Sequence, residues 1–354
     1  MNSADLFFIF CDDQQFRRAK AIKNILIGRR TVSNLYWALE YNLLDYVDSL
    51  HGINFDDIDH TLHRLQQQKL LLLDDQMRVK LTTSGMMKRQ QILSKLLPLK
   101  YLKIASQYDV SRFLQRFVFA TQIVSEYSYS NRKYYPQSIS FFEDQLIKKW
   151  FIQNKGQQLP ELFHQLLTDF LNWVNRDDLA TILVESLSGH HFSGKTEEQI
   201  SNQQQVSPLV IQICWRQLYS CLLLEIFKKK VNEPLTALTT NLRRPIISNS
   251  SRQTYDLFIH HPEESTAIIA SKRRIKITTV YEHLIEAAIF LPISQFPFQR
   301  LINPQIMDKL EFNQPALLGE WSYRDAVNKI PQLQFFEFRL YQILRRKQVN
   351  GKST

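Results

Sequence analysis

The chain has 354 residues and a mass of 42.0 kDa, with 44% hydrophobic and 22% charged residues. These proportions are close to those of globular domains, so they exclude a chain that is disordered throughout. The formal charge of +10 and the pI near 9.4 point to polyanionic partners, either nucleic acid or an acidic membrane surface. Residues 236–354 alone carry +6 of this charge, so the imbalance is concentrated in the C-terminal third.

Glycine is scarce, at 8 residues, which favours a mostly helical fold over a nucleotide-cradling Rossmann fold. Cys11, Cys214 and Cys221 show neither metal-ligand spacing nor a disulfide framework, which predicts buried thiols in a reducing compartment. The N-terminus lacks the pattern of a targeting signal, and the uninterrupted apolar runs are far shorter than the ~18 residues of a membrane span. We therefore expect a soluble cytoplasmic protein without a membrane partner, able to associate with the nucleoid.

Residues 1–95 follow the element order of a winged helix. A helix is expected over residues 15–27, a second begins after a Ser33 cap, and a third begins after an Asn54 cap. The apolar runs within residues 70–81 flank a short polar turn and predict a β-hairpin, after which a further helix opens. Domains of this kind bind either DNA or protein, so both roles stay open for this one.

Residues 96–240 have the pattern of a helical region with aromatic residues at helical spacing. Such residues form core far more often than they form a surface for stacking bases. Residues 198–215 follow the spacing of a degenerate helix-turn-helix, for which a plain helical hairpin is the alternative. A proline- and arginine-containing linker is expected over residues 232–249. The aromatic residues are Phe113, Phe117, Phe119, Phe141, Phe142, Trp150, Phe163, Phe170, Trp173 and Trp215.

The segment 189–196 satisfies the P-loop pattern G-x-x-x-x-G-K-[ST]. The following residues argue against a phosphate site, because Thr196 and Gln199 form a capping box and acidic residues fill the first turn of the next helix. No second apolar strand supplies an aspartate for magnesium. A nucleotide hydrolase using Lys195 is therefore the weakest interpretation.

No catalytic or metal-binding constellation is evident in the sequence. His60 and His63 lie three residues apart beside several aspartates, but a metal site would need a third ligand at definable spacing, so a solvated helix face is expected. No Ser-His-Asp, Cys-His or paired-carboxylate arrangement has defensible spacing. We therefore expect no catalytic residues, no metal, no cofactor and no enzymatic activity.

The strongest pattern lies at residues 250–291, where three helices are expected. The first begins after a cap at Ser250 and Ser251 and is broken by residues 260–262, and the third runs over residues 278–289. Apolar residues lock two of these helices at the steep angle of a helix-turn-helix. The expected core positions are Ile269, Ile275, Val280, Leu284, Ala287 and Leu291, and the expected solvent face of the third helix holds Thr278, Thr279, Glu282 and Glu286.

The run IASKRRIKITTVYEHLIE at 269–286 looks like the helicase helix-turn-helix domain at the C-terminus of some RecQ-type helicases. The whole chain resembles the YpbB-like proteins of Gram-positive bacteria, which end in this domain and are typically encoded beside a RecQ helicase. The other matching stretches are GRRTVSNLYWAL at 28–39, LSGHHFSGKTEEQI at 187–200 and FFEFRLYQI at 335–343. In that comparison the position of Lys195 need not be lysine. The resemblance implies a DNA-binding module and a RecQ-type helicase as partner.

The domain departs from the family pattern at two places. Arg274 stands where a turn glycine is usual, which requires φ > 0 only if the turn is the tight form. Glu282 and Glu286 would repel phosphate from the third helix, which favours contacts to the DNA backbone over base readout. The predicted nucleic-acid-binding residues are Lys272, Arg273, Arg274, Lys276, Thr278, Thr279 and Tyr281. Unspecific phosphate attraction is expected from Arg339, Arg345, Arg346 and Lys347.

The sequence therefore predicts a mostly α-helical protein with a winged-helix-like domain at 1–95, a helical middle region at 96–240 and a helicase helix-turn-helix domain at 241–354. Its predicted function is that of a non-enzymatic DNA-binding accessory protein that works with a RecQ-type helicase in DNA replication or repair. The alternative is a protein–protein adaptor that binds a helicase without contacting DNA itself.

Overall fold

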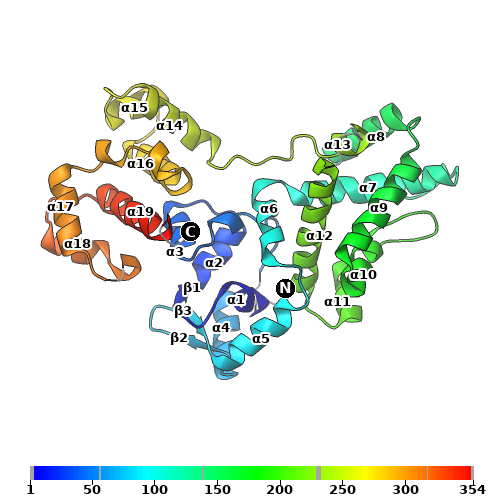
Figure 1. Cartoon of the computed structure of the whole chain (residues 1–354), viewed down its shortest axis with the longest axis horizontal. Coiled ribbons are helices and arrows are strands. Elements are labelled where there is room, and N and C mark those ends of the chain that lie inside the picture. Colours follow the sequence, from blue (N-terminus) through cyan, green and yellow to red (C-terminus); the bar gives the residue numbers. More distant parts are fainter. Residues whose placement is uncertain (1–3, 56, 138, 229–232, 317, 352–354) are drawn as a thin grey trace. The chain divides into compact units, whose positions relative to one another are not determined.

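The protein is mostly helical, with 66% helix and few strands, which confirms the predicted class. It divides into two compact units, whose elements are labelled in Figure 1. Unit 1 is Met1–Gly28 with Tyr46–Arg244, and unit 2 is Arg29–Asp45 with Pro245–Thr354. The structure, a computed structural model, describes residues 4–55, 57–137, 139–228, 233–316 and 318–351.

The first part of unit 1 combines short helices with a three-stranded antiparallel sheet of strand order β1-β3-β2. β2 and β3 form the predicted hairpin, in which Leu71 lies opposite Leu81. β1 was not predicted; it pairs Arg17 with Val79 and occupies the start of the helix expected over residues 15–27. The elements are α1 (Ala4–Phe10), β1 (Arg17–Arg18), α2 (Ala19–Leu26), η1 (Leu44–Tyr46, where the chain returns to this unit), α4 (Ile58–Gln67), β2 (Leu71–Leu73), β3 (Arg78–Leu81) and α5 (Thr83–Leu93).

Two predicted N-caps are wrong by two or three residues. Asp57, not Asn54, accepts the hydrogen bond from the amide of Asp59 at the start of α4. Thr31, not Ser33, caps α3 (Val32–Glu40). A side-chain oxygen caps a helix only from the residue directly before its first turn, so the backbone path decides among neighbouring candidates.

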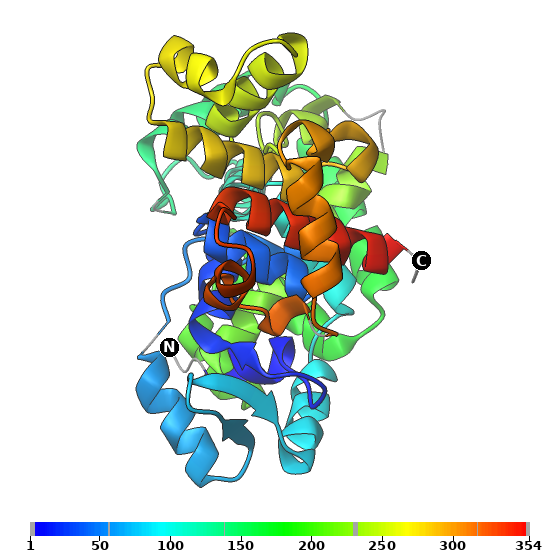
Figure 2. The same cartoon turned by 90° about the vertical axis from the view of Figure 1, so that its left-hand side faces the viewer.

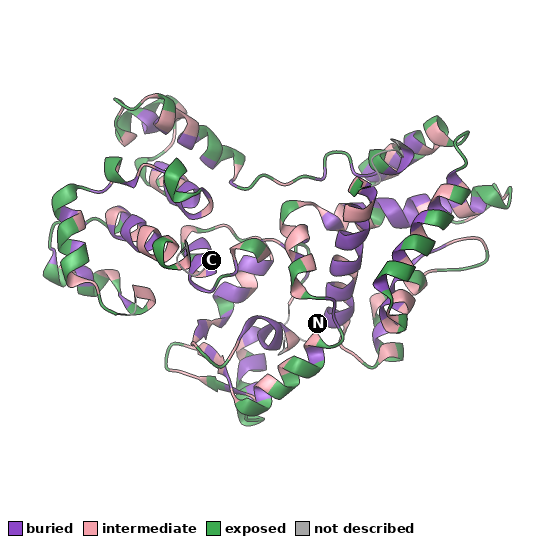
Figure 3. Cartoon of the chain, viewed as in Figure 1, coloured by how far each residue is buried: buried purple, intermediate pink, exposed green. Residues whose placement is uncertain are grey.

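α12 (Pro208–Lys228) is the core helix of unit 1 and packs against α7, α10 and α11. Among the described residues, only this helix is long and apolar enough to cross a membrane; 72% of its most apolar window is buried inside the protein. Figure 3 shows the buried residues that run along it. The other elements of this part are η2 (Leu99–Lys103), α6 (Ile104–Gln107), α7 (Val110–Ser128), α8 (Phe141–Asn154), α9 (Leu159–Val174), α10 (Asp177–Ser186), α11 (Glu197–Gln204) and α13 (Glu233–Ala237).

Most aromatic residues of this helical part form core, as predicted. Phe117 stacks on Phe163 with ring centroids 5.5 Å apart, and both rings are buried. Phe141, Phe142 and Trp173 are exceptions, because their side chains are exposed. The buried members of the predicted set are Phe113, Phe117, Phe119, Trp150, Phe163 and Phe170.

A buried ion pair joins α7 to α8. Arg116 Nε donates to Glu143 Oε2, and neither side chain is more than 2% exposed. Arg112 Nη2 donates to Glu143 Oε1 at 2.6 Å, while Arg116 Nη1 donates to the carbonyl oxygens of Leu238 and Thr240. Burial alone would raise the pKa of Glu143, but hydrogen bonds from Arg116 and Arg112 hold it below its ordinary value. The pair therefore meets the condition under which a buried charge is tolerated, namely satisfied hydrogen bonds.

Unit 2 is completed by α3, which comes from the N-terminal part of the chain and packs against α16 and α19. The arrangement can be followed in Figure 2, where blue α3 lies among the yellow-to-red helices. Leu35, Tyr36 and Leu39 form the buried face of α3, and the Arg339 guanidinium lies 3.7 Å from the Tyr36 ring centroid. The other elements are α14 (Asn249–His260), α15 (Thr266–Arg273), α16 (Ile277–Phe290), η3 (Ile293–Gln295), η4 (Phe298–Arg300), α17 (Pro304–Asn313), η5 (Leu318–Glu320), α18 (Tyr323–Lys329) and α19 (Phe335–Gly351).

We expect residues 245–354 alone to fail to fold, because without α3 they expose the apolar surface that Leu35, Tyr36 and Leu39 cover. A fragment in which residues 29–45 are linked to residue 245 through a flexible Gly/Ser linker should recover a cooperative thermal transition, followed by circular dichroism. A cooperative transition from the bare 245–354 fragment would show that α3 is dispensable to this unit.

Candidate nucleic-acid interface

The three helices predicted within residues 250–291 are α14, α15 and α16, which pack against one another in unit 2. Ser265 caps α15, whereas the cap of α14 is Ser248 and not the predicted Ser250 and Ser251. The predicted core positions Ile269 and Val280 are both 0% exposed. Leu284, Ala287 and Leu291 are also buried, whereas Ile275 is only half-buried.

The turn between α15 and α16 is the tight form. Arg274 has φ 51° and ψ 43°, in the left-handed region, and its amide donates to the carbonyl oxygen of Ser271. The amide of Ile275 donates to the carbonyl oxygen of Ala270, which closes the end of α15. An arginine therefore occupies a conformation that glycine usually supplies, and its side chain is exposed.

The seven predicted binding residues divide into free and engaged groups. Arg274, Lys276 and Thr278 are exposed, and among the described residues the two cations have no ion-pair or hydrogen-bond partner for their side chains. Lys272 is also exposed, but its Nζ donates to Glu264 Oε1. The structure therefore brings two free cations together at the start of α16.

Arg273, Thr279 and Tyr281 are less accessible than predicted. Arg273 Nη1 donates to the carbonyl oxygen of Ser250 at 2.7 Å and to Thr254 Oγ1 at 2.6 Å, so it holds α15 against α14. The Tyr281 ring stacks on Phe336 of α19, with centroids 4.2 Å apart. Arg273 and Tyr281 therefore stabilise the unit, whereas Thr279 is half-buried.

Within the described parts of the chain, no side chain accepts a hydrogen bond from the first amides of α16. Lys276 is the N-cap residue and makes no capping hydrogen bond, whereas Ser248 and Ser265 cap the two preceding helices. Orphan amides and the helix dipole both favour an anion at such an end. The free cations Arg274 and Lys276 therefore lie beside backbone N–H groups that also carry partial positive charge.

Glu286 corrects one prediction, because it does not lie on the solvent face of α16. It is 6% exposed, and its Oε1 accepts hydrogen bonds from the Ser248 amide and from Arg30 Nε, each at 2.9 Å. Its Oε2 accepts from the hydroxyls of Ser248 and Ser251. Glu282 is exposed as predicted; one turn further along, the same helix face is covered by the start of α14 and by Arg30.

The C-terminal cations predicted to attract phosphate are engaged within unit 2. Arg345 pairs with Glu311 at 2.8 Å, and Arg346 donates to the carbonyl oxygen of Glu40. Lys347 Nζ donates to the carbonyl oxygen of Leu291 at the end of α16, and burial lowers the pKa of Lys347 to about 8. Arg339 stacks on Tyr36.

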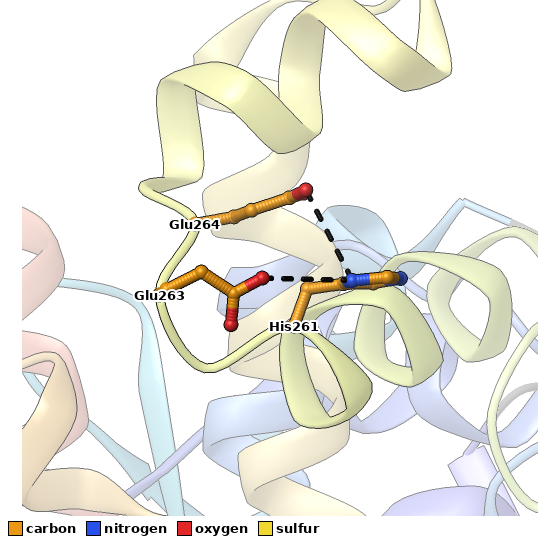
Figure 4. Close-up of side chains that lie close together, drawn as sticks. All are labelled: His261, Glu263 and Glu264. Atoms are coloured by element: carbon orange, nitrogen blue, oxygen red, sulfur yellow. Dashed lines mark ion pairs between the residues drawn. The ribbon is translucent and has the colours of Figure 1, made fainter.

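His261, Glu263 and Glu264 lie close together in the turn between α14 and α15, as Figure 4 shows. His261 Nδ1 is 3.8 Å from Glu263 Oε1 and 4.0 Å from Glu264 Oε1. Because Glu264 Oε1 already accepts from Lys272, the cluster is an ion-pair network that links the turn to the end of α15. His60 and His63 are exposed on α4, as expected for a solvated face.

The P-loop-like segment 189–196 already has protein acceptors for its lysine and most of its amides. Lys195 Nζ donates to Glu185 Oε1 at 2.6 Å and to Gln203 Oε1 at 2.7 Å. The amides of Gly189 and Phe192 donate to each other's carbonyl oxygens, which makes a tight turn instead of an open cradle. The predicted capping box of Thr196 with Gln199 is present.

The turn between α11 and α12 has the local form of the degenerate helix-turn-helix. Gln205 has φ 53°, in the left-handed region. The first turns of α12 are buried, including Val210 and Ile211, so they offer no face to a groove and fit the helical hairpin. Cys214 and Cys221 are buried as predicted, and burial raises the pKa of each thiol to about 12.

No family model, curated protein or solved structure matches this chain. The candidate site is therefore defined by the geometry of the basic turn alone. Its core is Arg274, Lys276 and the amide end of α16.

We expect Glu286→Gln to destabilise unit 2 at pH 7 by about 1–3 kcal/mol, because hydrogen bonds to a charged acceptor are replaced by weaker ones. Burial alone would raise the pKa of Glu286, but the Ser251 hydroxyl and Arg30 hold it below its ordinary value of 4.5. Its contribution is therefore complete above about pH 5 and is lost as pH falls through the folded-state pKa. In thermal melts from pH 7 to 3, the difference in melting temperature between the parent and Glu286→Gln should shrink. Glu282→Gln is the exposed control, and a difference that stays constant with pH would contradict this account.

We expect neither the parent nor Lys195→Ala to bind Mg-ATP with saturable heat. The reason is that Lys195 already donates hydrogen bonds to Glu185 and Gln203. Isothermal titration calorimetry on the full chain measures this, with Lys228→Ala, which removes a surface pair with Glu225, as the matched control. Saturable magnesium-dependent binding that only Lys195→Ala abolishes would restore the P-loop interpretation.

Proposed function

We propose that this chain is a non-enzymatic DNA-binding accessory protein that holds duplex DNA mainly through phosphate contacts of the basic turn. The supporting observation is the exposure of Arg274 and Lys276 beside the uncapped amides of α16. Cations and helix N-termini are the groups that proteins use most for contacts to phosphate, which fix position without reading sequence. Binding of this kind depends steeply on salt and little on base sequence.

The proposal assigns no base readout to α16. Its exposed Glu282 would lie near the phosphates and oppose them, and Tyr281 is stacked against α19. Thr278 and, less exposed, Thr279 remain as short polar side chains near the turn, able to contact a phosphate. Glu286 does not weaken binding as the sequence implied, since it is buried and neutralised by Arg30.

We also propose that the first part of unit 1 is winged-helix-like. Three helices, with the strand β1 between the first two, precede the β2–β3 hairpin; the strand order β1-β3-β2 is that of such a domain. In this interpretation α4, directly before the hairpin, takes the place of the recognition helix, and α3 is an excursion into unit 2. Both DNA and protein remain candidate partners of this module.

The proposed protein partner is a RecQ-type helicase, on the strength of the resemblance at residues 269–286. In this proposal the partner chain, and not the described residues, supplies the motor that unwinds DNA. The alternative, an adaptor that binds the helicase without DNA, is favoured by two apolar side chains beside the basic turn: Ile268 is 46% exposed and Ile277 is 38% exposed.

We expect the double variant Arg274→Gly with Lys276→Ala to bind duplex DNA more weakly at low salt, by a similar factor for unrelated sequences. Glycine keeps the left-handed turn, so the change removes charge without opening the backbone. Losing two phosphate contacts should flatten the slope of log affinity against log salt by roughly two units. Fluorescence anisotropy of a labelled duplex from 25 to 300 mM salt measures both.

The matched control is Lys309→Ala with Lys329→Ala, which removes the same charge from exposed positions on α17 and α18. Arg273 is left intact because its hydrogen bonds to Ser250 and Thr254 make it part of the packing. A folded double variant that keeps the parental affinity and salt slope would favour the adaptor, with Ile268 and Ile277 as the surface to test next.

A further inference from the structure

An unusual concentration of exposed rings lies in unit 1, in residues 127–142, which we call the tyrosine segment and which are described except for residue 138. It contains six aromatic residues, two cations and no acidic residue. Tyr135 is 96% exposed, Phe141 80% and Tyr129 67%, while Tyr127 and Phe142 are also exposed. Single exposed apolar side chains are normal, but a group of large rings in one stretch indicates an interaction surface.

The backbone of the tyrosine segment is held along α7 by polar clamps. Asn131 Nδ2 donates to Glu126 Oε2 at 2.7 Å. The buried Gln122 donates through Nε2 to the carbonyl oxygen of Tyr135 and accepts through Oε1 from the amide of Gln137. Glu126 is C-terminal to Gln122 on α7, so the segment runs back antiparallel to this helix. These hydrogen bonds, and not burial of its side chains, therefore hold the backbone of the segment in place.

One exposed tyrosine ring is already part of a stack. The rings of Tyr129 and His190 lie 4.4 Å apart at 19°, and His191 follows with its centroid 3.9 Å from that of His190. His190 Nδ1 is hydrogen-bonded to Glu126 Oε2 at 2.8 Å, which fixes the platform to α7. Planar bases stack on such rings whatever their sequence, because every base has a π face.

The charges around the segment favour a polyanion. Arg132, Lys133 and Lys155 are exposed, and among the described residues none has a carboxylate partner. Lys155 is brought to the segment by the Tyr127 hydroxyl, which donates to its carbonyl oxygen. Two acids lie near the segment, and both have partners: Glu126 is buried and hydrogen-bonded to His190 and Asn131, and Asp144 pairs with Lys148 at 2.9 Å.

A cavity of about 220 Å³ adjoins the tyrosine segment, which supplies Gln137 and Ile139 to its wall. Val118 of α7 and Trp215 of α12 add apolar and aromatic surface. Gln137 Oε1 is out of solvent and has no hydrogen-bond partner among the described residues.

We propose that the tyrosine segment binds single-stranded nucleic acid. Tyr129 and Tyr135 stack on unpaired bases, while Arg132 and Lys133 contact the backbone between them. Exposed rings on both sides of a pair of cations, in a stretch without acids, are a combination that binds single strands without reading their sequence. This site lies in unit 1 and is separate from the basic turn of unit 2, so it does not depend on duplex binding there.

The test is fluorescence anisotropy on the full chain with labelled oligo(dT) and oligo(rU) of 15 nucleotides and a duplex of the same length. Tyr129→Ala with Tyr135→Ala should weaken single-strand binding by roughly tenfold or more and leave duplex binding unchanged. Arg132→Ala with Lys133→Ala should reduce the single-strand salt slope by about 1.4. The control is Phe312→Ala, which removes an equally exposed ring from α17.

Preference between oligo(dT) and oligo(rU) assigns the site to DNA or RNA, and either result supports it. The double variant Arg274→Gly with Lys276→Ala should keep parental single-strand affinity, which separates this proposal from the one for the basic turn. The proposal is overturned if the parent binds neither oligonucleotide at 25 mM salt, or if the folded tyrosine variant binds as tightly as the parent. It is also overturned if these substitutions abolish binding to phosphatidylserine vesicles but not to the oligonucleotides, which would assign the segment to membranes.

Discussion

Unit 2 depends on one buried carboxylate, that of Glu286. It joins α16 to the start of α14 through Ser248 and Ser251 and to Arg30, 256 residues away in the chain. A buried carboxylate is tolerated only when its lone pairs are satisfied, so the three elements must meet in this one arrangement. The same helix begins at the basic turn, where Arg274 and Lys276 are exposed.

Local signals were enough to find the three helices α14, α15 and α16. The break after His260 and the apolar period through Val280 and Leu284 are both visible within one or two turns of sequence. The placement of α3 could not be read in this way. The apolar face of α3 could pack on any complementary surface. The contact that ties this part of the chain to unit 2 is made by Glu286. Helix periodicity placed Glu286 on the solvent face, because it cannot show what covers a face.

Net charge did not show which cations are free to meet a ligand. Arg273 and Arg274 are neighbours, yet the first holds α15 to α14 and the second is free, a difference set by the left-handed turn. Arg116 and Arg244 are likewise engaged, Arg244 with Asp48 at 2.7 Å. Long cationic side chains stabilise a fold by reaching carbonyl oxygens, so only those left without a partner are candidates for phosphate.

The scarcity of glycine explains why an arginine occupies the left-handed position of the basic turn. With 8 glycines, the chain places other residues in the left-handed region, among them Asn175 and Gln205 as well as Arg274. The left-handed arginine is therefore an ordinary turn residue of this protein, and strain does not mark it as functional. Gln205 occupies the equivalent turn between α11 and α12 with neutral neighbours, and the helix it introduces is buried in unit 1. A left-handed residue thus ends α11 before a buried helix in unit 1, and ends α15 beside exposed cations in unit 2. The two turns differ in their side chains.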